Sequence, residues 1–299
     1  MGKNQISRKE FVAKTLGGIA VIGIVSDHFP GGSVVQKQRS LGPEGIMVTP
    51  LCFGATRTNE ISLIKYGLDK GINFIDTGRS YANGNNERIV GQAIADIRNK
   101  VIIQTKIRLE ENELPSKGKG KKGVDEIRAV LMTKTEESLK ALNTDYIDLL
   151  LYHDASDENL LFHSEVLKFF SEMKTNGIIR ECGFSTHNDK INLIEKNISN
   201  RVYDTIMIPF NHKGSFIHSQ SGRYEEWDQK RLISVLEEAH KNGIGIVAMK
   251  SCSGGKYSPS ENIAPSFKEA VNWVLGHEFI SSVAVALANF EQIDEYTKV

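Results

Sequence analysis

Short apolar runs rich in β-branched residues alternate along the chain with longer stretches in which apolar residues recur every three or four positions. The longer stretches predict amphipathic helices, one of which carries Val166, Phe169, Phe170 and Met173 on a single face. The short runs predict eight strands, at residues 50–54, 72–76, 101–106, 147–152, 179–184, 204–209, 244–249 and 281–286. Uninterrupted apolar strands that alternate with helices are typical of a parallel sheet covered by helices.

The number of repeated units favours a closed barrel over an open, doubly wound sheet. Eight strand–helix units within about 240 residues match the size of a (β/α)8 TIM barrel. Gly71, Gly177 and Gly243 each come just before a predicted strand, where a helix needs a left-handed C-cap. The turn-rich segment 41–45 predicts a short hairpin that precedes the first barrel strand and lies outside the barrel.

The beginning of the chain differs from the rest and predicts three segments. Lys3, Arg8 and Lys9 precede the apolar run 16–25, which is too short to span a membrane. Segment 7–12 resembles a twin-arginine export signal in which Lys9 replaces the second arginine. We therefore expect an export-signal-like segment at 1–30, a linker at 31–38 and the barrel at 39–299, with the chain ending within the last helix. Export to the periplasm is the expectation, and an unprocessed cytoplasmic tail is the alternative.

The charge balance and the cysteines exclude several classes of partner. Lysines plus arginines and aspartates plus glutamates both number 37, so no net field favours nucleic acid or an anionic membrane. The most basic stretch, 117–122, has no aromatic residue on which a base could stack. The three cysteines lack a CxxC spacing, which predicts neither a disulfide framework nor a metal site. We expect a small-molecule partner.

Polar residues close three of the apolar strands. Asp76 ends the second strand, Lys106 the third, and His153 follows the fourth, while Tyr81 comes five residues after Asp76. The carboxyl ends of barrel strands meet on one face, so these side chains are expected to lie close together. Tyrosine can protonate a developing oxyanion if a nearby cation favours its phenolate. Lys106 would be that cation, Asp76 would hold it, and His153 would orient the substrate oxygen.

These motifs resemble those of the aldo-keto reductases. Residues 74–81, with the sequence FIDTGRSY, and 86–91, with NERIVG, are similar to the family segment in which Asp and Tyr stand five apart before a Glu and a Gly. Thr105-Lys106 and the run 145–153 are similar to the family's lysine and histidine strands. The resemblance runs from about residue 39 to 292. It implies an NAD(P)-dependent oxidoreductase that reduces an aldehyde or ketone, or oxidises the alcohol, with Tyr81, Lys106, Asp76 and His153 as catalytic residues.

The resemblance also implies residues that bind the nicotinamide. Ser185 and Thr186 stand where the family places a Ser-Asn pair that binds the carboxamide. Met207 stands at the position of a family glutamine. Phe210 replaces the family tyrosine that is expected to stack on the nicotinamide ring.

Two loops are implied to hold the phosphates of the cofactor. Lys250, Ser251 and Gly254 lie in a glycine-containing loop similar to the one that wraps the pyrophosphate. Asn289 and Gln292 follow the eighth strand, in a stretch with no cation for a 2′-phosphate. The cofactor is therefore expected to be NADP or NAD.

Two alternatives stay open. A barrel that binds the cofactor but serves as a non-catalytic regulatory or binding subunit is consistent with Met207 and Thr186. Some relatives continue with a cysteine-rich iron–sulfur region, which in this protein would follow Val299. Substrate-pocket candidates on the loops after the strands are His187, His212, Tyr224 and Trp227.

Overall fold

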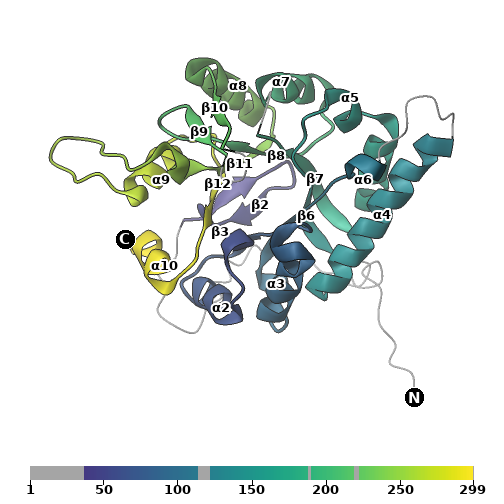
Figure 1. Ribbon diagram of the computed structural model, residues 1–299, viewed down its shortest axis with the longest axis horizontal. Coiled ribbons are helices and arrows are strands. Elements are labelled where there is room, and N and C mark those ends of the chain that lie inside the picture. Colours follow the sequence, from purple (N-terminus) through teal and green to yellow (C-terminus); the bar gives the residue numbers. More distant parts are fainter. Residues whose placement is uncertain (1–36, 114–121, 188–189, 219–221, 299) are drawn as a thin grey trace, which may run out of the picture.

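A computed structural model describes residues 37–113, 122–187, 190–218 and 222–298 (Figure 1). The side chains of residues 122–125 are also not described. The export-signal-like segment 1–30, nearly all of the linker 31–38 and most of the basic stretch 117–122 lie outside the described residues. The expectations about export and domain boundaries therefore stay predictions.

Eight parallel strands form a closed barrel in the order β11-β12-β3-β4-β5-β6-β7-β8 (Figure 1). The first barrel strand pairs with the last, with Cys52 opposite Ala284, and this pairing closes the ring. The predicted (β/α)8 class is thus confirmed, and each strand lies within two residues of its predicted bounds. The strands are β3 (Leu51–Gly54), β4 (Phe74–Asp76), β5 (Ile102–Ile107), β6 (Ile147–Tyr152), β7 (Ile179–Ser185), β8 (Thr205–Pro209), β11 (Gly245–Met249) and β12 (Ser282–Ala286).

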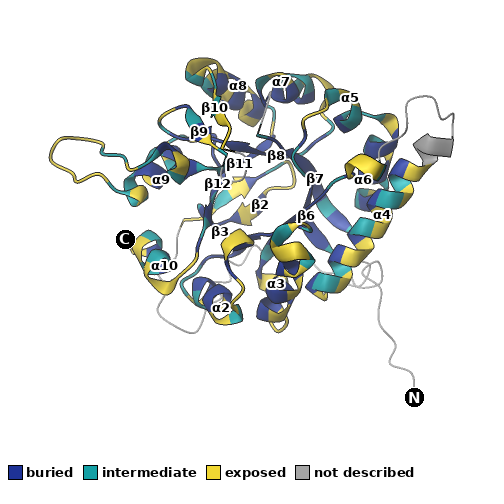
Figure 2. Ribbon diagram, in the orientation of Figure 1, coloured by how far each residue is buried: buried dark blue, intermediate teal, exposed yellow. Residues whose placement is uncertain are grey.

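Helices cover the outside of the barrel with their apolar faces turned inward (Figure 2). Gly71, Gly177 and Gly243 have the positive φ angles expected of left-handed C-caps. No helix in the described part of the chain is long and apolar enough to cross a membrane. The helices are α2 (Ile61–Asp69), α3 (Asn86–Ile94), α4 (Lys122–Leu142), α5 (Glu158–Leu161), α6 (Ser164–Thr175), α7 (Lys190–Asn200), α8 (Gln229–Lys241), α9 (Phe267–Leu275) and α10 (Phe290–Thr297).

The interior of the barrel is a packed core, because alternate residues of each strand point inward. Its apolar members include Cys52, Phe74, Leu149, Leu151, Met207 and Val247. The predicted hairpin is present as β1 (Arg39–Leu41) and β2 (Ile46–Val48). Its buried side chains, Leu41, Ile46 and Val48, join the interior cluster. The hairpin therefore plugs the amino-terminal end of the barrel.

A second hairpin, which the sequence did not predict, follows β8. It consists of β9 (Ser215–Ile217) and β10 (Tyr224–Glu226), with Phe216 opposite Glu225. Each strand has only three residues, too few for an alternating pattern to stand out. Phe216 is buried at 2% exposure, so the hairpin is packed onto the barrel beneath it.

Candidate active site

The structure brings the four predicted catalytic side chains together at the carboxyl ends of β4, β5 and β6. Asp76 and Lys106 belong to β4 and β5, and His153 directly follows β6. Tyr81 begins the 3-10 turn η2 (Tyr81–Gly84), which connects β4 to α3. Barrel enzymes carry their chemistry on this face.

Lys106 is the centre of the cluster and is 1% exposed. Its ammonium contacts the Asp76 carboxylate, donates to the Thr77 carbonyl at 2.7 Å and donates to the Tyr81 hydroxyl at 3.2 Å. Burial disfavours the ammonium, but Asp76 and then Tyr81 outweigh burial, so the pKa of Lys106 is raised. Lys106 is therefore a permanent cation beside the phenol.

Tyr81 combines a buried hydroxyl with that neighbouring cation. Burial raises the pKa of the Tyr81 phenol above its ordinary value, while the Lys106 ammonium acts in the opposite direction. The phenol is thus protonated at neutral pH, as a proton donor must be, and Lys106 stabilises the charge that remains once the proton leaves.

His153 lies across from Tyr81. The two rings are edge to face with their centroids 5.8 Å apart. Burial, together with Lys106 and Arg108, lowers the pKa of His153 to about 3. A neutral imidazole has one N–H to donate, and an atom placed between His153 and Tyr81 could therefore receive two hydrogen bonds.

The NERIVG segment holds the loop that carries Tyr81. The Asn86 amide donates to the carbonyls of Ala55 and Thr58 at 2.9 and 3.1 Å, and its oxygen accepts from the Thr77 hydroxyl at 2.6 Å. Glu87 is fully buried and accepts from the Thr105 hydroxyl at 2.6 Å, beside Lys106. The start of α3 is thereby tied to β5 and to the segment after β3.

Gln104 contacts the polar cluster from the interior of the barrel, and this role was not predicted from the sequence. Its amide donates to Asp76 Oδ1 at 2.6 Å and contacts Met207 Sδ at 3.3 Å. A signal was available in the sequence, because Gln104 precedes Lys106 by two positions and so shares its inward-facing register in β5.

Three of the residues expected to bind the nicotinamide lie in or beside the mouth of the barrel. Ser185 accepts a hydrogen bond from the Asp154 backbone N–H at 3.1 Å, which leaves the serine hydroxyl hydrogen available. Thr186 is fully buried, and its N–H donates to the Met207 carbonyl at 3.1 Å. Met207 is part of the interior cluster, where its sulfur contacts Gln104.

The structure does not bring Phe210 to the mouth. Its ring is fully buried outside the barrel, with centroids 5.2 Å from Trp273, 5.1 Å from His277 and 5.8 Å from Phe279. The expectation that Phe210 stacks on the nicotinamide is therefore wrong, and its ring packs against its neighbours instead. Met207 faces the interior of the barrel, and a residue three positions later in an extended chain faces the opposite side. Met249, the last residue of β11, is half-buried and packs against the interior cluster instead.

The loop expected to hold the phosphates follows β11. Lys250 has a left-handed φ of 59° and begins the turn η5 (Ser251–Gly254). A Cβ atom on Gly254 would lie 2.9 Å from Asn211 Oδ1, so a larger residue at this position would displace the Asn211 side chain. Ser251 is buried, and the Lys250 side chain is half-buried.

Asn289 and Gln292 form a reciprocal capping pair at the start of α10. The Asn289 side chain accepts from the Gln292 N–H at 2.9 Å, and the Gln292 side chain accepts from the Ala288 N–H at 2.9 Å. Both side chains stabilise the helix terminus in this structure.

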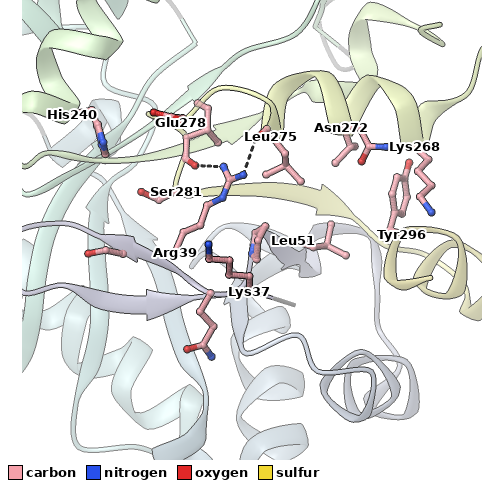
Figure 3. A pocket seen from close by; sticks show the side chains of 15 residues that line it. Lys37, Arg39, Leu51, His240, Lys268, Asn272, Leu275, Glu278, Ser281 and Tyr296 are labelled. Atoms are coloured by element: carbon pink, nitrogen blue, oxygen red, sulfur yellow. Dashed lines mark hydrogen bonds between the residues drawn. The ribbon is translucent and has the colours of Figure 1, made fainter. Parts of the chain in front are cut away.

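A pocket of about 590 Å³ lies on the other side of the barrel, near the hairpin β1–β2 (Figure 3). Its walls come from the starts of β3 and β12 and from α9 and α10. Arg39 crosses it and donates to the carbonyls of Leu275 and Ile280 at 2.8 and 2.7 Å, which caps the end of α9. The pocket is separate from the cluster around Lys106, which lies at the carboxyl ends of the strands.

The fold and the polar cluster define a TIM-barrel enzyme. The sequence profile of the Aldo/keto reductase family matches residues 53–298, and the chain belongs to this family. The resemblance noted from the motifs is thereby confirmed, as is the predicted enzyme class, an NAD(P)-dependent oxidoreductase.

Known relatives resemble the chain over most of its length. It is 24% identical over 285 residues to the "Uncharacterized oxidoreductase YqkF" of Bacillus subtilis, covering 87% of this chain and 90% of the relative. It is 37% identical over 207 residues to the "Methylglyoxal reductase DkgB" of Salmonella typhi, covering 68% of this chain and 66% of the relative.

Solved structures share the fold. The aldo-keto reductase AKR11C1 from Bacillus halodurans, in its holo form, superposes with a TM-score of 0.68 at 21% identity, covering 88% of this chain and 90% of that one. An aldo/keto reductase from Klebsiella pneumoniae in complex with NADP and acetate superposes with a TM-score of 0.63 at 19% identity, covering 88% and 89%.

Proposed function

We propose that this protein reduces an aldehyde or ketone with NADPH and that Tyr81 donates the proton. The observation that carries the proposal is the hydrogen bond of 3.2 Å between the Lys106 ammonium and the Tyr81 hydroxyl, with Asp76 buried against the same ammonium. The methylglyoxal reductase and the NADP complex among the relatives support a carbonyl substrate and this cofactor.

The residues of the mouth fit a nicotinamide cofactor. The free hydroxyl hydrogen of Ser185 can bind the carboxamide oxygen, and Met207 and Met249 offer an apolar floor for the ring. Lys250 has no acceptor among the described side chains and carbonyls and can bind a phosphate. When bound, the nicotinamide supplies the hydride that the amino acids cannot provide.

The protein's own side chains would then handle the substrate oxygen. His153 donates one N–H to it and holds it toward Tyr81. Tyr81 transfers its proton to the oxygen as negative charge develops there. Lys106 stabilises the resulting phenolate, and Asp76 keeps Lys106 in place.

The test is Tyr81→Phe, which removes the proton donor and keeps the ring. We expect kcat to fall by at least about a hundredfold, with NADPH binding retained in a fluorescence titration. Thr133→Val, an exposed change in α4, is the control. Unchanged turnover of an aldehyde panel by Tyr81→Phe would refute the assignment. Tight NADPH binding by a wild-type protein that turns over no carbonyl compound would favour the non-catalytic subunit.

A further inference from the structure

One wall of the barrel mouth contains side chains that, apart from Lys250, the proposed reaction does not use. This cationic wall lies on the segments that follow β7, β8 and β11. Its members are His187, Lys190, Phe216, Trp227 and Lys250.

Phe216 connects the members of the cationic wall. Its ring centroid is 5.8 Å from that of His187 and 6.4 Å from that of Trp227, and the Lys250 Nζ lies 5.6 Å from the same ring. The Lys190 Nζ lies 4.1 Å from the Trp227 ring. Residues from four separate segments thus form one contiguous cluster.

Lys190 is a buried cation with no hydrogen-bonded carboxylate among the described residues. It is 5% exposed, and no carboxylate or carbonyl of the described residues lies within hydrogen-bonding distance of its ammonium. Burial lowers the pKa of Lys190 to about 8, against a weak opposing effect of Glu225. A buried charge that lacks a hydrogen-bonded counter-ion costs free energy, which a bound anion would recover.

Lys250 adds a second uncompensated charge. Burial and then Arg57 lower the pKa of Lys250, and no carboxylate in the described part of the chain opposes them. The two lysines lie over two neighbouring aromatic rings, Lys190 over Trp227 and Lys250 over Phe216, and the faces of such rings stabilise cations.

His187 connects the cationic wall to the predicted catalytic residues. His187 contributes to the lowered pKa of His153. The pKa of His187 itself is lowered to about 4, mainly by burial and further by Lys250 and Lys190, while Asp154 acts in the opposite direction. Its buried Nδ1 has no hydrogen-bond partner in the described part of the chain. A neutral imidazole with a nitrogen that has no partner among the described residues therefore lies close enough to His153 and to the two lysines to affect or feel their charges.

We propose that the cationic wall binds an acidic group of the substrate, a carboxylate or a phosphate, so that the enzyme acts on anionic carbonyl compounds. This inference rests on the proposed function. A phosphate of the cofactor has the same chemistry, and the experiment separates the two sources.

The experiment compares 4-carboxybenzaldehyde with its methyl ester, which differ in the charge and in one methyl group, both remote from the aldehyde. Wild-type enzyme is expected to prefer the acid. In Lys190→Met, which keeps the length of the side chain, the ratio of kcat/KM for the acid to that for the ester is expected to fall about ten- to a hundredfold, as for loss of a charge-assisted hydrogen bond. Lys190→Arg retains the charge and is expected to retain most of the preference.

Lys196→Met is the matched control. Lys196 belongs to the same helix, and its Nζ also lies over an aromatic ring, at 4.8 Å from Phe162, but it pairs with Glu158. This variant is expected to keep the wild-type ratio. A fluorescence titration with NADPH establishes that each variant is folded and measures its affinity for the cofactor.

Two outcomes would overturn the inference. An unchanged ratio in Lys190→Met would show that the wall does not recognise the acidic group. An equal fall for both aldehydes, together with weaker NADPH binding, would assign Lys190 to a cofactor phosphate. If wild-type protein reduces neither aldehyde, calorimetric binding of 4-carboxybenzaldehyde to wild type and Lys190→Met decides the inference, while the aldehyde panel decides the proposed function separately.

Discussion

At the scale of single residues, the ion pair between Asp76 and Lys106 combines a structural and a chemical role. Both side chains are almost completely buried, at 3% and 1% exposure, so each depends on the other for its charge. Removing one partner of such a pair leaves an uncompensated buried charge, which typically costs about 3–5 kcal/mol. Replacing both partners by apolar groups has a much smaller cost.

The first prediction follows from this asymmetry. Asp76→Asn is expected to lower the free energy of unfolding at pH 7 by about 3–5 kcal/mol and to abolish reduction. The double variant Asp76→Leu, Lys106→Met, in which both partners are apolar, is expected to recover most of the stability and none of the activity. Urea unfolding and an aldehyde reduction assay measure the two effects. Full activity in the double variant would contradict the role of Lys106.

At the scale of elements, Glu181 joins the hairpin β1–β2 to the barrel. It is fully buried in β7 and accepts from the Glu44 N–H at 3.0 Å and from the Thr205 hydroxyl at 3.1 Å. A Cβ on Gly42, whose φ is 69°, would lie 1.9 Å from a Glu181 oxygen, so the hairpin turn requires glycine there. Burial raises the pKa of Glu181 to about 7 despite the Glu44 N–H.

The raised pKa of Glu181 predicts how the free energy of unfolding depends on pH. The unfolded glutamate has a pKa of about 4.3, so between that value and about 7 the folded state binds more protons. The stability contributed by protonated Glu181 is therefore present at low pH and lost as pH rises through about 7. Glu181→Gln imitates the protonated form, and its stability relative to wild type is expected to increase by about 1–3 kcal/mol between pH 5 and pH 8.

Urea unfolding of both proteins at the two pH values measures the difference. Subtracting the free energy of unfolding of wild type from that of the variant at each pH removes the contributions of His153 and His187, because these residues titrate in both proteins. Glu237→Gln, an exposed change in α8, is expected to show no such trend. A constant difference between Glu181→Gln and wild type would exclude proton uptake by Glu181.

At the scale of the whole molecule, the barrel mouth couples cofactor binding to folding. The expected cofactor site combines the ends of β7, β8 and β11, which are far apart in sequence and meet only in the closed barrel. A ligand that binds only the folded state stabilises it by about 2.7 kcal/mol at a hundred times its Kd. For a domain of this size that corresponds to roughly 5–10 °C in Tm.

NADPH is therefore expected to raise Tm by that amount in differential scanning fluorimetry. Lys250→Met is expected to reduce the shift, because it removes the unpaired cation at the phosphate loop. Lys241→Met, at the exposed end of α8, serves as the control. No shift with either NADPH or NADH would contradict the cofactor site.

The sequence by itself determined the fold class and the polar cluster. Apolar runs with the period of a strand, alternating with helical patterns, identify the eight strands because both faces of a parallel sheet are buried. Asp76, Lys106 and His153 could be predicted to meet because they close such strands, and carboxyl ends of barrel strands share one face. Local spacing carries all of this information.

Only the tertiary structure decided which face each remaining side chain presents and which distant segments touch. Phe210 packs outside the barrel and Met249 lies at the mouth, because the register of β8 and β11 within the ring sets their directions. Lys190 and Trp227 meet through a hairpin whose strands are too short to leave a pattern. Burial of Lys190 and Glu181, and hence their shifted pKa values, depends on packing between elements, for which a single sequence contains no periodic signal.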